Sequence, residues 1–221
     1  MFGLEPTPFD LRMVAFRIPI RVHPSFWIAG AVLSWNPERM DVMFMWVMCL
    51  FVSIMVHELG HALMGEAFGW PSEVLLYWCG GLALSQRQHD RTPWREIAVS
   101  LAGPFAGFGL FGLTVGIDYL LPHERHLNVS LILIYLVYIN LWWGLINLLP
   151  VLPLDGGHVC QSLLIWCGFR NPVRIAAMIG ALVAGGASAL FFTHFKQNFA
   201  GMLFAMLCLQ NVVTLQEDGR H

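Results

Sequence analysis

The stretch DVMFMWVMCLFVSIMVHELGHALMGEAF, residues 41–68, decides the fold class of this chain. It is longer than the roughly 20 mostly apolar residues that a helix needs to cross a bilayer. Its second half contains the pattern H-E-L-G-H at residues 57–61, which places three ionisable side chains inside an otherwise apolar helix. Such groups are costly in a membrane and usually mark function. One segment therefore predicts both a membrane-spanning helix and a polar site within it.

The composition extends this prediction to the whole chain. Of 221 residues, 57% are hydrophobic and only 12% are charged, whereas a soluble domain carries about 25% charged residues. We therefore expect a multi-pass integral membrane protein in a lipid bilayer. The net charge of -2 and the lack of a Lys/Arg-rich run argue against a nucleic-acid partner. The five cysteines form no C-x-x-C pair, which argues against a disulfide framework and a cysteine-type zinc site.

The predicted fold class is an all-α membrane protein with about six transmembrane helices. A stretch at 198–214 is apolar but carries two amides near its end, and 24–35 is short and ends at an Asn-Pro turn signal. We expect 24–35 to be a tilted or incomplete span. Four other stretches are long and apolar enough to span a bilayer, namely 41–68, 95–121, 128–149 and 172–193.

A small β element is predicted after the second span. The run from Val74 to Ser85 is mainly apolar, is broken by Gly80-Gly81, and is too short to span as a helix. These features favour strand, turn and strand. Backbone of this kind lies near lipid only when it pairs internally or lines a protein cavity. We therefore expect a membrane-associated β element.

The basic residues predict the orientation of the spans. With six crossings both termini lie on one side, and the positive-inside rule makes that side cytoplasmic. If 24–35 does not cross, the N-terminus lies outside, but the loops at 70–94 and 168–174 remain the basic ones. Nine basic residues fall on the terminal side, Arg12, Arg17, Arg21, Arg87, Arg91, Arg95, Arg170, Arg174 and Arg220, against Arg39, Arg125 and Lys196 on the other.

The pattern at residues 57–61 is the metal-binding motif H-E-x-x-H. His57 and His61 are four residues apart, so a helix presents both imidazoles on one face. Zinc held by imidazoles lowers the pKa of its bound water toward about 7, and Glu58 lies close enough to act as general base. Chance would place about 0.013 such patterns in a chain of this composition. A functional motif is therefore favoured over polar groups that are satisfied within a helix bundle.

A third ligand is expected, because catalytic zinc usually takes three protein ligands and leaves one position for water. The fourth predicted span is followed by NLLPVLPLDGGH, residues 147–158, whose prolines end the helix and favour extended backbone. Asp155 is the one acid in this apolar neighbourhood and the candidate ligand. Its structural alternative is to cap a helix from Gly156 to about Cys167. His158 as a fourth ligand would close the position of the water, so a supporting or helix-terminal role is favoured.

The patterns H-E-L-G-H and N-x-x-P-x-x-P-L-D-G-G, about ninety residues apart, resemble those of the site-2 protease family of intramembrane zinc proteases. Three shorter stretches agree with the family: residues 19–23, Gly80-Gly81 and residues 102–104. Ala106-Gly107 departs from it, because many relatives carry Asn after the Gly-Pro pair. The chain resembles a minimal form of the family, without a PDZ-like or CBS-like module.

This resemblance implies roles for five residues. His57, His61 and Asp155 would ligate one zinc ion per chain, Glu58 would be the catalytic base, and Asn147 would assist in the active site, for example at the oxyanion. The resemblance also implies a single metalloprotease domain over the whole chain. Its parts would be a cytoplasmic N-terminal segment 1–23, the catalytic core spans 24–167 and a C-terminal span pair 168–221.

The expected function is zinc-dependent cleavage of the transmembrane segment of a single-span membrane protein substrate. The active site would face the cytoplasmic side of the cell membrane, the inner membrane if the source is prokaryotic. The alternative is a non-catalytic membrane protein that binds or carries a metal. Glu58 favours the enzyme, because a carrier needs no base between its ligands, and a transporter would show paired broken helices. The β element is expected to hold an unwound substrate by β-augmentation, and otherwise to pack as a re-entrant loop.

Overall fold

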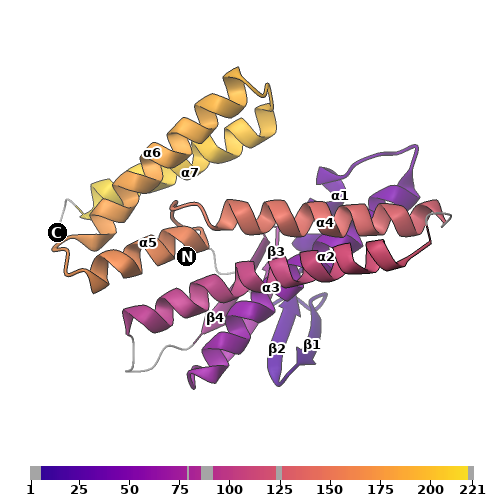
Figure 1. Cartoon of the computed structure of the whole chain (residues 1–221), viewed down its shortest axis with the longest axis horizontal. Coiled ribbons are helices and arrows are strands. Elements are labelled where there is room, and N and C mark those ends of the chain that lie inside the picture. Colours follow the sequence, from indigo (N-terminus) through magenta and orange to yellow (C-terminus); the bar gives the residue numbers. More distant parts are fainter. Residues whose placement is uncertain (1–5, 79, 86–91, 123–125, 219–221) are drawn as a thin grey trace. The chain divides into compact units, whose positions relative to one another are not determined.

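The structure is a computed structural model that describes residues 6–78, 80–85, 92–122 and 126–218. Over these residues the chain is mostly helical and carries one small sheet, so the predicted fold class is confirmed (Figure 1). The elements follow in the order β1 (Leu11–Ala15), β2 (Ile18–Val22), α1 (Pro24–Leu33), α2 (Met40–Ala67), β3 (Ser72–Tyr77), β4 (Gly80–Ser85), α3 (Pro93–Leu120), α4 (Leu127–Asn147), α5 (Asp155–Trp166), α6 (Pro172–Thr193) and α7 (Asn198–Asp218).

Five helices in the described part of the chain are long and apolar enough to cross a membrane: α2, α3, α4, α6 and α7. They correspond to five of the predicted spans, and the chain is an integral membrane protein. The sixth predicted span is the helix α1, which has only ten residues. At 1.5 Å per residue α1 is about 15 Å long, half the thickness of the hydrocarbon core. The estimate of six spans is therefore approximate.

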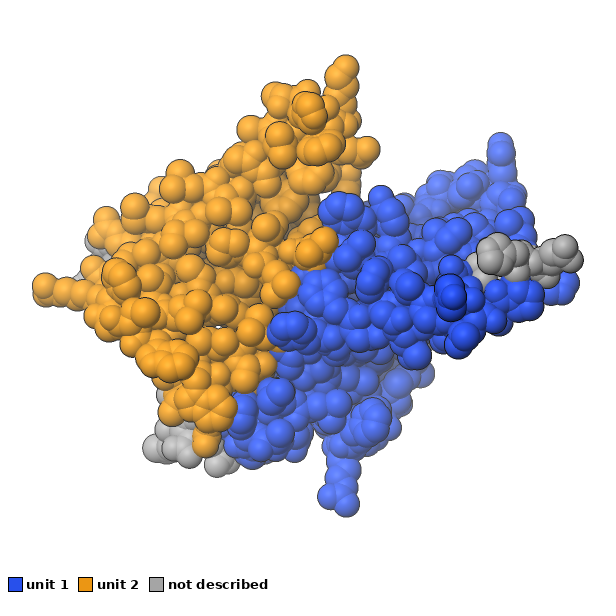
Figure 2. Space-filling view, in the orientation of Figure 1, with its two compact units in different colours: residues 1–89, 102–144 blue, residues 90–101, 145–221 orange. Residues whose placement is uncertain are grey.

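The described chain divides into two compact units, which Figure 2 colours separately. Unit 1 contains Met1–His89 and Ala102–Gly144, and unit 2 contains Asp90–Leu101 and Leu145–His221. The strands and α1 and α2 belong to unit 1, whereas α5, α6 and α7 belong to unit 2. Each unit is described by itself below.

The sheet of unit 1 contains four strands among the described residues, in the order β1-β2-β3-β4. The predicted strand, turn and strand are confirmed as β3 and β4, which pair antiparallel. The hairpin of β1 and β2 was not predicted. Its turn uses Phe16 and Arg17 at positive φ, 52° and 69°, where hairpin turns usually carry Asn-Gly or Asp-Gly. The sequence therefore lacks the common hairpin signal at this turn.

The strand β2 and the helix α1 together run antiparallel to α2. β2 pairs in parallel with β3, which starts beside the C-terminal end of α2, where the Glu66 carboxylate accepts a hydrogen bond from Ser72 N at 2.8 Å. Further along, the rings of Phe26 in α1 and Phe51 in α2 have centroids 6.0 Å apart. Strand and helix add up to about 31 Å, close to the thickness of the hydrocarbon core.

The core of unit 1 lies between the sheet and α2. In β2, buried residues alternate with more exposed ones, as expected for a strand with one buried face. In β3, Val74, Leu75 and Leu76 are all buried. These residues pack on the face of α2 that also carries the H-E-L-G-H pattern. The buried cluster consists of Ile18, Ile20, Val22, Phe26, Ile54, Met55, Ala62, Val74 and Leu76.

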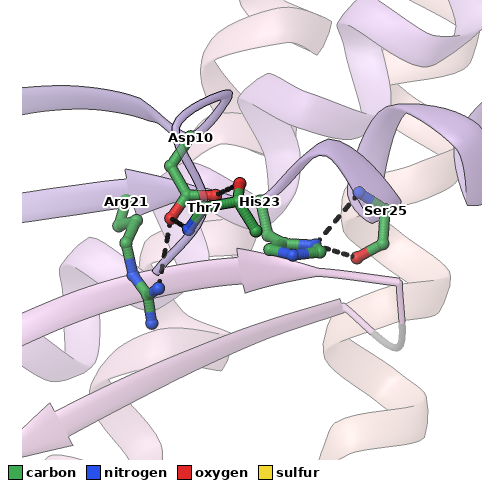
Figure 3. Close-up of polar contacts among 5 residues, drawn as sticks. All are labelled: Thr7, Asp10, Arg21, His23 and Ser25. Atoms are coloured by element: carbon green, nitrogen blue, oxygen red, sulfur yellow. Dashed lines mark hydrogen bonds and ion pairs between the residues drawn. The ribbon is translucent and has the colours of Figure 1, made fainter. Parts of the chain in front are cut away.

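The stretch at residues 19–23, noted in the sequence, ties the N-terminal hairpin to its neighbours (Figure 3). Arg21 donates to Asp10 Oδ2 at 3.2 Å, and Thr7 donates to the same carboxylate from its hydroxyl and its backbone amide. The Thr7 hydroxyl above all, together with Arg21, holds the pKa of Asp10 below its usual range. His23 caps α1, because its Nδ1 accepts from Ser25 N at 3.1 Å. These contacts are structural and fix the entry into α1.

In unit 2, α6 and α7 pack closely through small residues. The Phe191 and Phe204 rings stack with centroids 5.5 Å apart, and Ser188 Oγ donates to Gly201 O at 2.9 Å. At the contact between Ser188 and Gly201, both residues are small, and this lets the two helix backbones approach closely. It agrees with the small-residue pattern in the sequence of α6. The buried small residues of α6 are Ala176, Ala177, Gly180, Ala184 and Ser188.

Candidate metal centre

Helix α2 of unit 1 carries three buried ionisable side chains within five residues. His57, Glu58 and His61 are exposed by only 3%, 6% and 7%. They lie in the last three turns of a 28-residue helix that is otherwise almost entirely apolar. Burial of three such groups costs free energy unless they are paired or bind an ion. The helix therefore creates a polar site inside an apolar body.

The two histidine rings are arranged as ligands of one metal ion. His57 Nε2 and His61 Nε2 are 3.2 Å apart, and the ring planes lie at 80° to each other. Two imidazole nitrogens bound to a tetrahedral Zn²⁺ at about 2.0–2.1 Å would be about 3.3 Å apart. The spacing of the two nitrogens thus fits a shared zinc ion.

Helix α3 supports His61 through a glycine. A β-carbon built on Gly103 would lie 2.5 Å from His61 Cε1 and 2.7 Å from His61 Cδ2. The imidazole therefore rests on the bare Cα of Gly103, and a larger residue would displace the ring. At the residue directly before His61, a β-carbon built on Gly60 would lie 2.5 Å from Ala102 O and 2.8 Å from the β-carbon of Ala106 in α3. Ala106, a departure from the family pattern, thus fills a tight interface between the two helices.

Strand β4 supports Glu58 in the same way. A β-carbon on Gly81 would lie 2.5 Å from both Glu58 Cδ and Glu58 Oε1. The carboxyl group of Glu58 therefore touches the backbone of β4. The Gly80-Gly81 pair was singled out in the sequence as a turn signal, but its packing role against Glu58 could be seen only in the structure. This contact places the edge of the sheet directly beside the candidate base.

Helix α4 adds contacts that sequence reasoning missed. Trp143 lies against His57 with ring centroids 6.4 Å apart. Asn140 is 2% exposed, and its Nδ2 donates to Ser53 Oγ at 2.9 Å. Ser53 lies one turn before His57, so this hydrogen bond joins α4 to the ligand-bearing helix. The sequence shows only a single amide, Asn140, in an apolar span, and this does not predict that its partner is Ser53.

Asn147 and Asp155 belong to unit 2 and flank an irregular segment, residues 148–154. Asn147 is the last residue of α4, and Asp155 is the first residue of α5. Leu154 holds the N-cap position, so the alternative that Asp155 caps α5 is wrong. Asp155 is half-buried, whereas His158, one turn later, is exposed. Asp155 therefore lies in the first turn of α5 and not at its cap.

The two glycines after Asp155 let segment 148–154 fold back over the start of α5. A β-carbon on Gly156 would lie 2.5 Å from Leu149 O, and one on Gly157 would lie 2.6 Å from Leu152 N. In both places backbone meets backbone, and backbone cannot move aside as a flexible side chain can. The D-G-G pattern therefore follows from the close approach of two backbone segments.

The chain is similar to known proteins in sequence and in fold. A family model described as Peptidase family M50 matches residues 45–122 and 114–192. The chain is similar to a candidate zinc metalloprotease of Synechocystis sp., with 38% identity over 184 residues that cover 75% of the chain and 47% of the relative. It is also similar to a zinc metalloprotease of Methanocaldococcus jannaschii, with 32% identity over 176 residues that cover 76% of the chain and 49% of the relative.

The chain spans about half the length of the curated relatives it matches. Among solved structures it is similar to the site-2 protease from Methanocaldococcus jannaschii, with a TM-score of 0.58 and 23% sequence identity. That match covers 96% of this chain and 94% of the solved chain. The likeness shows a shared fold.

Proposed function

Because the chain belongs to peptidase family M50, we propose that it is a zinc-dependent intramembrane endopeptidase that cleaves transmembrane segments of membrane proteins. The observation that carries this proposal is the pair of Nε2 atoms of His57 and His61, 3.2 Å apart, with the buried Glu58 between them in an apolar helix. Relatives named as zinc metalloproteases support the choice of metal and reaction.

The proposed zinc ligands are His57, His61 and Asp155. Two imidazoles and one carboxylate are a donor set of catalytic zinc sites, and these described residues could supply it. Such a set leaves one coordination position open for water. We propose that the chain forms a single metalloprotease domain, because one family's model matches residues 45–122 and 114–192.

Glu58 is the proposed general base. Zinc at this site would lower the pKa of a water molecule and polarise the scissile carbonyl. Glu58 would accept a proton from the attacking water as the water oxygen bonds to the carbonyl carbon. It would then deliver that proton to the amine nitrogen when the C–N bond breaks. The Asn147 side-chain amide is the proposed donor to the negative charge that develops on the carbonyl oxygen.

The free edge of β4 is the proposed place where an unwound substrate pairs. Among the described strands β4 pairs only with β3, so one side of its backbone is open to another strand. Gly81 of β4 touches Glu58. A peptide that extends the sheet would therefore lie beside the base and would replace hydrogen bonds lost when its helix unwinds. A single-span membrane protein is the proposed substrate class.

The proposed orientation places both termini and the active site on the cytoplasmic side. We propose that β2 and α1 together make a first crossing. With the five apolar helices that follow, both termini would then lie on one side, and the basic residues favour the cytoplasm. Reporter domains fused after Arg91, Arg174 and Arg220 should report cytoplasm, and one near His126 should report the opposite side. A cytoplasmic signal at His126 would overturn this topology.

The function is tested by Glu58→Gln in purified full-length protein. We expect cleavage of an unwound single-span reporter to fall about 10²–10⁴-fold, the usual contribution of a general base, while zinc stoichiometry stays at the wild-type value. The matched control is Glu66→Gln on the same helix, which keeps an oxygen to accept the hydrogen bond from Ser72 N. Wild-type cleavage by Glu58→Gln would contradict the mechanism. Zinc uptake by vesicles without any cleavage would favour a metal carrier.

A further inference from the structure

Asn211 in α7 is a fully buried amide that the catalytic motifs do not account for. Its exposure is 0%, whereas the neighbouring Gln210 is exposed. The two residues follow each other in the sequence, yet only one faces the interior. An amide buried in an apolar helix costs free energy unless it forms hydrogen bonds. The hydrogen bonds of Asn211 therefore indicate what it does.

One of these hydrogen bonds reaches the segment that precedes Asp155. Asn211 Nδ2 donates to Leu152 O at 2.6 Å, and also to Leu207 O of its own helix at 2.8 Å. The second bond stays within α7. The first joins residues 59 positions apart and ends three residues before Asp155. α7 thus holds the backbone of segment 148–154 directly.

Helix α6 leaves room for this contact through Gly180. A β-carbon on Gly180 would lie 2.9 Å from Asn211 Cγ and 3.3 Å from Val151 Cα. Val151 is fully buried in a cluster with Ala184, Phe204 and Leu207. Segment 148–154 therefore packs into the α6 and α7 pair, with Gly180 on one side and the Asn211 amide as its hydrogen-bond donor.

We propose that Asn211 is a positioning residue for Asp155. It anchors the Leu152 carbonyl, and so holds segment 148–154 and the start of α5 in the arrangement that presents the Asp155 carboxylate to the metal. Without the anchor, this irregular segment would have to be ordered when zinc binds, and that ordering would reduce affinity. The inference rests on the proposed function, in which Asp155 is the third zinc ligand.

The test measures zinc affinity of the full-length protein by competition with a chelator. We expect Asn211→Leu to weaken zinc binding at least tenfold, the lower end of the range for residues that support ligands. The matched control is Ser188→Ala, which removes a different buried hydrogen bond in unit 2, the one from Ser188 of α6 to Gly201 O of α7. This control should stay within about twofold of wild type, because the Ser188 hydroxyl donates to α7 and not to segment 148–154.

A second measurement needs no metal and no activity. Backbone amide exchange of residues 148–157 in the zinc-free protein should speed up in Asn211→Leu and not in Ser188→Ala. If Asn211→Leu does not fold, Asn211→Ser replaces it. A serine hydroxyl can donate to Leu207 O within α7 but is too short to reach Leu152 O. It should therefore show the same loss of zinc affinity.

Asp155→Ala separates this inference from the proposed function. If Asp155→Ala binds zinc like the wild type, the ligand assignment fails, and the positioning role fails with it. If Asp155→Ala loses zinc while Asn211→Leu keeps wild-type affinity and exchange, only the positioning role is overturned. Equal losses in Asn211→Leu and Ser188→Ala would also overturn it, since packing of α6 and α7 would then explain both. Adding Asn211→Leu to Asp155→Ala should cause no further loss.

Discussion

Helix α2 and segment 148–154 hold their parts of the proposed metal site in opposite ways. In α2, regular helical periodicity brings His57 and His61 onto one face, and neighbouring elements only press against the rings. Segment 148–154 has no such periodicity, and Asp155 follows backbone that is shaped by contacts with α6 and α7. In α2 the spacing of neighbouring residues sets the positions of the ligands, whereas in segment 148–154 residues that are distant in the sequence set the position of Asp155.

This contrast has a consequence for how each region responds to mutation. In α2, loss of a supporting contact leaves the helix intact. The ligand side chains move only when a substitution introduces atoms into the space that they occupy. In segment 148–154, loss of a single anchor frees several residues, because no regular hydrogen-bond ladder holds them. Four predictions examine this difference, from the largest expected effect to the smallest.

The largest effect is expected from removal of a ligand in either region. His61→Ala and Asp155→Ala should each weaken zinc binding by more than about 100-fold, beyond the range for residues that only support ligands. Cleavage should be lost with the zinc. Zinc content of the purified variants and chelator competition measure this. Tight stoichiometric zinc in Asp155→Ala, with loss in His61→Ala, would show that unit 2 contributes no ligand.

A smaller but clear effect is expected at the glycine under His61. Gly103→Ala should weaken zinc binding about tenfold or more, because its methyl group would push into the imidazole. The control is Gly109→Ala on the same helix, where an added β-carbon would meet nothing within 4 Å. Both changes favour the helix by up to about 1 kcal/mol. Equal zinc affinity in the two variants would contradict the proposed contact between Gly103 and His61.

The open edge of β4 can be tested with prolines at Leu82, Ala83 and Leu84. In an antiparallel pair alternate residues direct their N–H groups to the partner strand, so the scan includes outward-facing positions. At least one variant should slow cleavage tenfold, about 1.4 kcal/mol in transition-state binding, with zinc content and folding intact. If all three cleave like the wild type, another surface holds the substrate.

The smallest effect is expected at the amide that joins α4 to α2. Asn140→Leu and Ser53→Ala should each lower stability, with a coupling energy of about 0.6 kcal/mol in a double-mutant cycle. Zinc affinity should stay within about twofold of wild type, because α2 places its histidines through its own periodicity. Reversible unfolding in mixed detergent measures the first quantity. A tenfold loss of zinc affinity in Asn140→Leu would contradict the expectation that α2, unlike segment 148–154, places its ligands without help from a distant amide.

The sequence alone was sufficient wherever the signal was local. Span length and apolarity predicted α2, α3, α4, α6 and α7, because a helix that crosses lipid must satisfy its own backbone and expose apolar side chains. The strand pair was predicted over residues 74–85 from the length of that run and its Gly-Gly break, and the structure starts it at Ser72. The pattern at residues 57–61 predicted the two paired imidazoles, since a spacing of four residues has one geometric meaning on a helix.

Tertiary structure decided what depends on residues far apart in the chain. The strand β2 pairs in parallel with β3, and no property of residues 18–22 reveals that pairing. Gly81 touches Glu58 and Gly103 touches His61 because β4 and α3 both pack against α2. Asn211 reaches Leu152 across 59 positions. Helical periodicity depends on residues that are close in the sequence, so the sequence alone predicts it. These contacts depend on how distant elements pack, so only the folded structure shows them.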